Sequence, residues 1–372
     1  MSKVKVLVAV GMTGGHIFPG IAVAEELKAF DSGCQVVFAG SGRGRAKSLV
    51  ARAGYNFIAV GARGWVGVGT RGKMLFLFLM AMSLVAAFLA LLRERPQVVV
   101  GTGSYATVPF AVSALLMGIP TVLLEQNVVP GKATRLLSHF AREVHVAYGE
   151  STRHLSKRAR GIVSGNPVRR SLFAPDRKSS IKEFDLDANL KTVFVFGGSR
   201  GARSINRAFA DAAHVLSEHD ELQFIVQTGE DDLQWVREAC TKAKLKAYTA
   251  PFIHGMELAY ACADIVVCRA GATTVAELTA LGLPSILIPY PYSAGGHQEK
   301  NAMMLQKAGA SVLVYDRRLT GEILASLILE TLKSEARLAS MAKAAKALGR
   351  RDAGRHIAQS ILNAGRRECS GR

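Results

Sequence analysis

A short apolar run that ends in a glycine-rich turn and continues into a helical pattern occurs in both halves of the sequence. Residues 4–10 (VKVLVAV) lead into the turn 11–16 (GMTGGH), and residues 192–196 (TVFVF) lead into the turn 197–202 (GGSRGA). Runs of this kind are typical of strands buried on both faces of a parallel sheet. Helices must then cover both faces, so the pattern predicts α/β domains of the Rossmann type.

The length of 372 residues favours two domains, each large enough to bury its own core. The repeated pattern places one domain in residues 1–165 and the other in residues 166–345. Residues 346–372 are then a C-terminal helix with a basic tail, and the polar residues 174–190 are interpreted as a linker-like segment. We expect two facing Rossmann-like domains with a cleft between them, where the carboxyl ends of the strands bind ligands.

The net charge of +18 is uneven, because residues 1–165 hold 19 Lys/Arg against 7 Asp/Glu and residues 166–372 hold 28 against 22. A basic first half implies an anionic partner such as a phosphorylated substrate or an anionic lipid surface. The sequence has no zinc-finger spacing, aromatic RNA-binding motif or long Lys/Arg run, so no nucleic acid partner is expected. The five cysteines form no CxxC pair or metal-ligand spacing, and the chain begins with a strand pattern instead of a signal peptide, which favours the cytosol.

The turn 197–202 has the strongest features of a phosphate-binding turn. Its glycines and the Ser199 hydroxyl precede a helix start, whose free N–H groups can bind an anion; a tight turn without a ligand is the alternative. The turn 11–16 lacks the dinucleotide fingerprint, and residues 40–42 (GSG) offer no acid for a ribose, so a nicotinamide enzyme is not expected. His16 is expected on the loop before a helix at about 19–30, as a general base or as an ordinary cap.

Residues 264–302 predict a strand, a helix start and a polar loop in close succession. An apolar run at 265–268 precedes a turn with Gly271, and Thr274 and Glu277 have the spacing of a capping box. A strand at 285–289 then leads into a Pro/Gly-rich loop and a polar cluster: His297, Gln298, Glu299 and Asn301. The arrangement suits a phosphorylated ligand that carries a sugar, although an ordinary βαβ unit would give the same pattern.

Residues 74–92 (MLFLFLMAMSLVAAFLALL) carry no charge and are flanked by Arg71, Lys73, Arg93 and Arg95. Their length suggests a transmembrane helix. A single span would, however, place the strand expected at 98–101 on the other side of the membrane from the preceding strands of its sheet. We therefore expect a helix that packs on the sheet and offers an apolar face to an anionic membrane surface, with a fully buried helix as the alternative.

Seven motifs in this order make the chain similar to glycosyltransferase family 28 over about residues 4–360: TGGHIFPG (13–20), GSYATVP (103–109), EQN (125–127), GNPVR (165–169), GGSRGAR (197–203), CRAGATTVAEL (268–278) and HQEKNA (297–302). This GT-B family includes bacterial enzymes that transfer GlcNAc from UDP-GlcNAc to the C4 hydroxyl of undecaprenyl-pyrophosphoryl-MurNAc-pentapeptide. The resemblance implies an inverting transferase without metal or other cofactor, peripheral on the cytoplasmic face of the bacterial inner membrane. The loops expected at the cleft contain no Asp-x-Asp metal motif, which agrees with that chemistry.

The resemblance also assigns roles to individual residues. In the second domain Ser199 and the helix after Gly271 would meet the donor pyrophosphate, Ile253 would pair its backbone with uracil, and Glu277 would accept the ribose hydroxyls. Gln298, with His297, would hold the GlcNAc hydroxyls, and Arg169 would act from the domain junction. In the first domain His16 would be the base or would position the acceptor. The remaining candidates would line the cleft. Thr13, Gly14, Gly15 and Asn127 would bind either the donor or the pyrophosphate and sugar of the acceptor. Tyr105 and Glu125 would bind the acceptor.

Three positions depart from the family pattern. Met12 replaces a glycine, Leu124 replaces a histidine often found before EQN, and His254-Gly255 replaces an acidic pair in the uracil-side loop. Alternatives to this activity remain: a diacylglycerol glycosyltransferase, a UDP-GlcNAc 2-epimerase with the same two-domain fold, or a nucleotide-sugar sensor. The apolar segment 74–92 and polar groups on both sides of the expected cleft favour the transferase.

Overall fold

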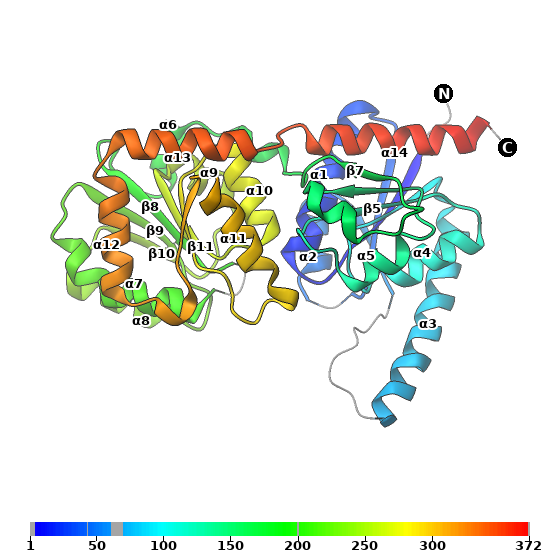
Figure 1. Cartoon of the computed structure of the whole chain (residues 1–372), viewed down its shortest axis with the longest axis horizontal. Coiled ribbons are helices and arrows are strands. Elements are labelled where there is room, and N and C mark those ends of the chain that lie inside the picture. The colour runs from blue at the N-terminus through cyan, green and yellow to red at the C-terminus, as the bar shows by residue number, and fades with distance from the viewer. Residues whose placement is uncertain (1–3, 43, 61–69, 199–200, 371–372) are drawn as a thin grey trace. The chain divides into compact units, whose positions relative to one another are not determined.

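The structure is a computed structural model of the chain that describes residues 4–42, 44–60, 70–198 and 201–370; for residues 70–78, 294 and 367–370 it describes the backbone alone. The chain forms two compact units, Met1–Arg169 with Arg350–Arg372, and Arg170–Gly349. The boundary therefore falls after residue 169 instead of residue 165, and the C-terminal helix belongs to the first unit (Figure 1).

The first unit contains a seven-stranded, wholly parallel sheet of order β3-β2-β1-β4-β5-β6-β7. This order reverses direction between β1 and β4, and such a reversal opens a crevice at the carboxyl ends of the two strands. The strands are β1 (Lys5–Ala9), β2 (Gln35–Gly40), β3 (Asn56–Ala59), β4 (Val98–Gly101), β5 (Thr121–Glu125), β6 (Glu143–Val146) and β7 (Gly161–Val163).

Helices cover both faces of this sheet. Successive side chains of β1 point to opposite faces of the sheet. Val6 and Val8 pack with α1, α2 and α14 on one face, whereas Leu7 and Ala9 pack with α3 and α4 on the other. The C-terminal helix α14 joins the first core because it buries Ile357, Ala358, Ile361 and Leu362 there. The helices are α1 (Gly14–Phe30), α2 (Ala46–Arg52), α3 (Thr70–Glu94), α4 (Thr107–Leu116), α5 (Lys132–Leu137) and α14 (Ala353–Ser370), with a 3-10 turn η1 (Gly149–His154).

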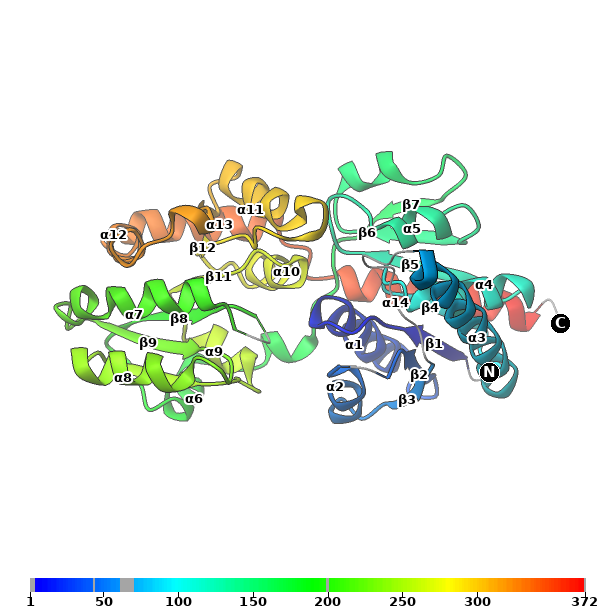
Figure 2. The ribbon, with the colours of Figure 1, turned by 90° about the horizontal axis from the view of Figure 1, so that it is seen from below.

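Helix α3 confirms that the apolar segment at 74–92 is helical and that the chain returns to the same sheet in β4. It lies beside α4 (Figure 2), and its Ala87 and Leu91 enter the core. Its first turns extend past the sheet (Figure 1). No helix in the described part of the chain is both long enough and apolar enough to cross a bilayer.

The second unit repeats the architecture with a six-stranded parallel sheet of order β10-β9-β8-β11-β12-β13, which reverses direction between β8 and β11. Its strands are β8 (Lys191–Phe196), β9 (Leu222–Gln227), β10 (Ala247–Ala250), β11 (Ile265–Cys268), β12 (Ser285–Leu287) and β13 (Ser311–Leu313). Its helices are α6 (Arg177–Glu183), α7 (Arg203–Ser217), α8 (Leu233–Ala243), α9 (Met256–Cys262), α10 (Ala272–Leu281), α11 (His297–Lys307), α12 (Gly321–Leu332) and α13 (Glu335–Leu348), with 3-10 turns η2 (Arg170–Phe173), η3 (Ala294–Gly296) and η4 (Asp316–Arg318).

Three local expectations were wrong. Helix α1 begins at Gly14, so His16 lies in its first turn and not on the preceding loop. The segment 174–190 contains α6, which starts where Asp176 accepts a hydrogen bond from the backbone N–H of Ser179 at 2.8 Å. Helix α10 has Gly271 as its N-cap, so Thr274 lies inside the helix and the capping box with Glu277 does not form.

Candidate functional site

His16 is held at the reversal point of the first sheet. Its Nδ1 lies 2.6 Å from the main-chain oxygen of Thr102, directly after β4. A carbonyl oxygen can only accept, so Nδ1 carries the proton and Nε2 keeps its lone pair. This tautomer is the one that a general base requires, and the half-buried ring is held in one orientation.

Gly11 makes this position possible. A Cβ at Gly11 would lie 2.9 Å from Cδ2 of His16 and 2.8 Å from Cβ of Ser104. Neither distance is compatible with a real side chain, so glycine is needed for β1, the His16 ring and the Ser104 turn to meet. The glycine-rich turn therefore has a packing role as well as a possible role in ligand approach.

Thr13, Gly14 and Gly15 form the amino-terminal end of α1. Thr13 is the N-cap, but its side chain makes no capping hydrogen bond and is exposed. The first N–H groups of a helix of this length attract anions, so the arrangement suits a pyrophosphate. Tyr105, which begins the segment before α4, is 38% exposed and therefore accessible.

Glu125 and Asn127 belong to one loop at the end of β5. One carboxylate oxygen of Glu125 accepts the Asn127 backbone N–H and side-chain Nδ2, each at 3.1 Å, and the other accepts the Gly131 N–H at 3.0 Å. Glu125 is only 3% exposed. Its carboxylate thus holds the loop, and Asn127, which is half-buried, is the better placed of the two to reach a ligand.

Arg169 ends the first unit, where its guanidinium lies over the Phe18 ring of α1 at 4.4 Å from the centroid.

The positions that depart from the family pattern differ in their surroundings. Met12 is 50% exposed beside the His16 turn, whereas Leu124 is 1% exposed in the core with α1 and α14. Leu124 therefore contributes packing in this chain.

In the second unit the turn after β8 lies against the end of β9. A Cβ at Gly197 would lie 2.2 Å from the Ala202 nitrogen, and one at Gly201 (φ +76°) would lie 2.0 Å from the Thr228 oxygen. Gly198 (φ +100°) has open space on that side. These glycines fold the turn tightly and leave one side open, as a phosphate site requires. Ser199 lies outside the described residues.

Arg269 connects four segments at the carboxyl edge of this sheet. Its guanidinium donates to the Asp316 carboxylate, to the Ser204 hydroxyl of α7 at 2.9 Å, and to the main-chain oxygens of Ile288 and Pro289 at 3.2 and 3.3 Å. Ser204 in turn donates to Asp316 at 2.7 Å. The starts of α7 and α10 and the end of β12 are thereby fixed relative to one another.

The backbone of Ile253, which the resemblance pairs with uracil, has its N–H bonded within the protein. The N–H donates to Oε1 of Gln227 at 2.8 Å, and the residue is 5% exposed. Pairing with a nucleobase through this N–H would require Gln227 to give up the hydrogen bond. The loop itself does lie beside the glycine turn, because Gln227 also contacts Gly198.

Glu277 is buried (5% exposed) and accepts a hydrogen bond from the Tyr260 hydroxyl at 3.0 Å. Tyr260 packs edge-on against Phe194 and Phe196 of β8, so the carboxylate lies near the centre of the sheet. Burial, with the Glu277 charge adding to it, raises the pKa of Cys268 at the end of β11. The Tyr260 hydroxyl thus holds Oε2 of Glu277 in place.

His297 and Gln298 open helix α11 beside the loop after β12. Oε1 of Gln298 accepts the Tyr290 N–H at 2.9 Å, and this hydrogen bond connects the loop to the helix. The amide nitrogen of Gln298 takes no part in it. Asn301, one turn later, donates to the Ala270 oxygen at 3.1 Å. Of the predicted donor residues, Ile253 follows the carboxyl end of β10, Gln298 follows the loop after β12, and Glu277 lies on α10 after β11. Gln227 and Tyr260 lie outside the seven sequence motifs, and Arg269 lies within one of them, at 268–278, but had no assigned role.

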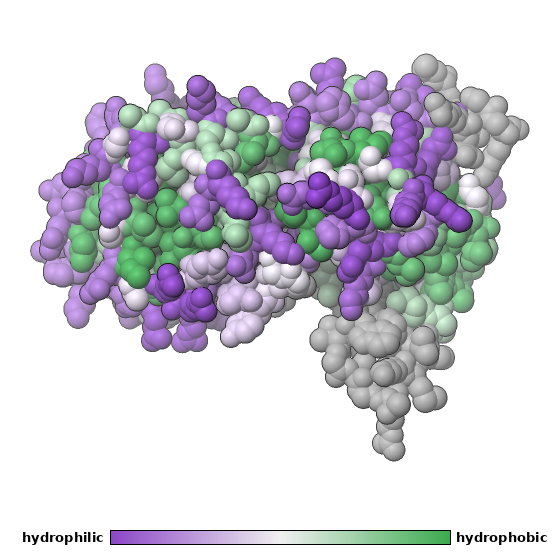
Figure 3. All heavy atoms as spheres, in the orientation of Figure 1, coloured by the Kyte–Doolittle hydropathy of each residue, from purple (hydrophilic) through white to green (hydrophobic). Residues whose placement is uncertain are grey.

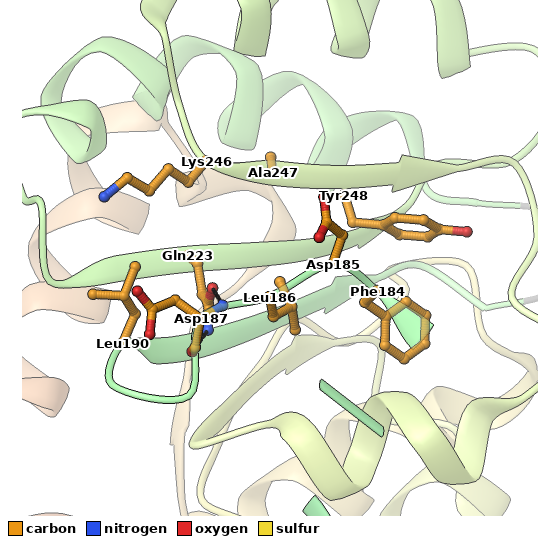
Figure 4. A pocket seen from close by; sticks show the side chains of 9 residues that line it. All are labelled: Phe184, Asp185, Leu186, Asp187, Leu190, Gln223, Lys246, Ala247 and Tyr248. Atoms are coloured by element: carbon orange, nitrogen blue, oxygen red, sulfur yellow. Dashed lines mark hydrogen bonds between the residues drawn. The ribbon is translucent and has the colours of Figure 1, made fainter. Parts of the chain in front are cut away.

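A pocket of about 430 Å³ lies at the opposite, amino-terminal edge of the same sheet (Figure 4). It is formed by residues 184–190 together with Gln223 of β9 and residues 246–248. None of the residues predicted for the site lines it. The pocket is therefore separate from the candidate donor site.

Comparisons with known proteins agree with this geometry. Residues 6–146 match the glycosyltransferase family 28 N-terminal domain and residues 192–357 match the C-terminal domain of that family. The chain is 39% identical to a UDP-N-acetylglucosamine–N-acetylmuramyl-(pentapeptide) pyrophosphoryl-undecaprenol N-acetylglucosamine transferase of Thermodesulfovibrio yellowstonii, over 96% of this chain and 99% of that protein. It is 42% identical to the protein of the same name from Chlorobaculum tepidum, over 96% and 98%.

Solved structures give the same answer at the level of the fold. A crystal structure of Acinetobacter baumannii MurG matches with a TM-score of 0.74 and 25% identity, over 97% of this chain and 100% of that one. A Neisseria meningitidis UDP-GlcNAc 2-epimerase bound to UDP-GlcNAc shares the fold alone, with a TM-score of 0.72 and 13% identity over 96% and 100%. The two parallel-sheet units have the GT-B fold, and the matched family domains and named relatives make the chain a glycosyltransferase. The chain belongs to glycosyltransferase family 28.

Proposed function

We propose that this protein transfers GlcNAc from UDP-GlcNAc to the C4 hydroxyl of undecaprenyl-pyrophosphoryl-MurNAc-pentapeptide, with inversion of the anomeric centre. Relatives that are about 40% identical over nearly the full length carry the name of this activity. In the structure, the proposal rests on the contact between Nδ1 of His16 and the main-chain oxygen of Thr102. With Nδ1 engaged there, Nε2 is the nitrogen that can act as the base. An inverting transfer needs one such base on the acceptor hydroxyl.

The second unit supplies what the leaving group needs. The start of α7 and the tight turn at Gly197 and Gly198 would offset the charge of the departing diphosphate, without any group of this chain forming a covalent bond. Glu277 would accept the ribose hydroxyls and Gln298, with His297, would hold the sugar. Arg169, stacked on Phe18, would act on the donor from the end of the first unit. Thr13, Gly14, Gly15, Tyr105 and Asn127 would line the acceptor side, on which Glu125 fixes the loop.

We further propose that the protein binds the cytoplasmic face of the inner membrane peripherally, through α3 and α4. Exposed apolar side chains recur along one face of α3, at Met82, Val85, Leu89 and Leu92, and continue at Leu115 and Leu116 of α4. Figure 3 shows this apolar region where the two helices meet. The exposed cations of Arg93, Arg95, Lys132 and Arg135 lie on the same or the adjoining helices and suit anionic headgroups.

Purified protein incubated with labelled UDP-GlcNAc and a synthetic lipid-linked MurNAc-pentapeptide tests the activity. Label in the lipid product supports the proposal. Formation of UDP-ManNAc without acceptor would instead identify the epimerase that shares the fold, and transfer to diacylglycerol in place of the MurNAc lipid would overturn the assigned acceptor.

A further inference from the structure

Gln227 is the last residue of β9 and pairs in register with the last residues of both neighbouring strands, Phe196 of β8 and Ala250 of β10. The glycine turn follows Phe196, and the loop that contains Ile253 follows Ala250. Gln227 therefore stands between the two segments that the proposed donor site would use for phosphate and for nucleobase. Its side chain is almost completely buried, at 2% exposure.

The amide of Gln227 is bonded to both segments. Nε2 donates to the Gly198 oxygen at 3.0 Å, and Oε1 accepts from the Ile253 N–H at 2.8 Å. Both partners are main-chain groups, so the two hydrogen bonds fix the backbone positions of Gly198 and Ile253 whatever the side chains of those segments do. Glutamine can form both hydrogen bonds because its amide carries both a donor and an acceptor on one side chain.

We propose that Gln227 is a positioning residue that fixes the spacing between the phosphate turn and the nucleobase loop. This inference rests on the proposed function, because it assumes that a uridine diphosphate sugar binds at this edge of the sheet. With the bridge in place, one rigid ligand can contact both segments at once. Without the two hydrogen bonds, the turn and the loop still form. The distance between them is then no longer fixed at the length that a nucleoside diphosphate spans.

The chain contains a matched control on the same strand. Gln223 is also 2% exposed and also bonds a loop through its amide: Oε1 accepts the Asp187 N–H at 2.9 Å, and Nε2 donates to the Asp187 oxygen at 2.7 Å. It lies at the amino-terminal edge, in the separate pocket of Figure 4. Replacing Gln223 therefore removes a comparable buried amide without touching the donor edge.

The experiment compares Gln227→Met, Gln227→Glu and Gln223→Met. Each protein is assayed for kcat and for the KM of UDP-GlcNAc, and its binding of UDP and of uridine is measured by titration calorimetry. Gln227→Met should raise the KM roughly tenfold, the equivalent of about one net hydrogen bond, and leave kcat within about threefold. Gln223→Met should lower Tm about as much as Gln227→Met does, but its KM for UDP-GlcNAc should stay at the wild-type value.

Gln227→Glu separates the two contacts. It keeps the acceptor for Ile253 but loses the donor to Gly198, so UDP binding should weaken more than uridine binding. The inference is overturned if Gln227→Met keeps a KM within about twofold of wild type, or if Gln223→Met raises the KM equally. A wild-type protein that neither binds UDP nor transfers GlcNAc would overturn the proposed function itself, which is a different result.

Discussion

Nδ1 of His16 lies 2.6 Å from the main-chain oxygen of Thr102, and this contact joins the first turn of α1 to the end of β4. It fixes both the tautomer and the direction of the imidazole. Because the partner is a backbone atom, no side-chain substitution at residue 102 removes it directly. The orientation of the candidate base is thus a property of the sheet reversal between β1 and β4.

Replacing His16 with alanine should lower kcat by a factor of about 10² to 10⁴, the usual contribution of a general base. The KM for UDP-GlcNAc should change little, since the proposed donor residues other than Arg169 lie in the second unit. His139→Ala is the control, because that exposed imidazole also has its Nδ1 near a main-chain oxygen, Leu136 at 3.1 Å. Steady-state kinetics with varied donor and acceptor separate the two effects. Full activity of His16→Ala would remove His16 from the chemistry.

Tyr260→Phe should raise the KM for UDP-GlcNAc several-fold, by roughly the value of one hydrogen bond, and leave kcat nearly unchanged. The change removes the hydroxyl that holds one Glu277 oxygen but keeps the ring against Phe194 and Phe196. Glu277→Gln in the same assay provides the comparison. If Tyr260→Phe leaves the KM unchanged while Glu277→Gln raises it, Tyr260 does not orient the carboxylate.

Leu89→Ser combined with Leu116→Ser should weaken binding to vesicles that contain anionic lipid, because both side chains are exposed, at 58% and 75%, on the proposed membrane surface. Val215→Ser is the matched control, since Val215 is 41% exposed on α7 of the other unit. Vesicle flotation at fixed salt measures the bound fraction. Equal flotation of the double variant and the wild type would assign the apolar face to another role.

The strand pattern was predictable because buried parallel strands are nearly continuous apolar runs. The expected strand at 265–268 is β11, Ile265–Cys268, and α10 ends at Gly282, an αL cap with φ +73°. Both features depend on short-range physics, namely burial on two faces and the steric freedom of glycine.

The site contacts were less accessible from the sequence. His16 was expected on a loop because Pro19 suggested a helix start, but α1 accepts Pro19 inside the helix and starts at Gly14. The capping box at Thr274 failed because Gly271 already provides an extended N-cap. The contacts of Gln227 span 26 and 29 residues of sequence, and no local pattern encodes such a distance.

His145 should make the stability of the first unit depend on pH. It is 3% exposed on β6 beside the buried Glu143 carboxylate, which also accepts from Arg160 at 2.9 Å and from the Ser360 hydroxyl of α14. Burial lowers the pKa of His145 below its ordinary value of 6.5, although Glu143 opposes this shift. Below about pH 6.5 the unfolded chain therefore takes up a proton that the folded chain does not, and stability falls as the pH falls.

His145→Gln should make the decline of Tm between pH 7.5 and about pH 5 shallower, because it removes this difference in proton uptake. His356→Gln, at an exposed histidine of α14, should leave the wild-type slope unchanged. Thermal unfolding in buffers of constant ionic strength measures both slopes. A His145→Gln slope equal to that of wild type would mean that Glu143 compensates the burial of His145 fully, so that the imidazole binds protons equally in the folded and unfolded chain.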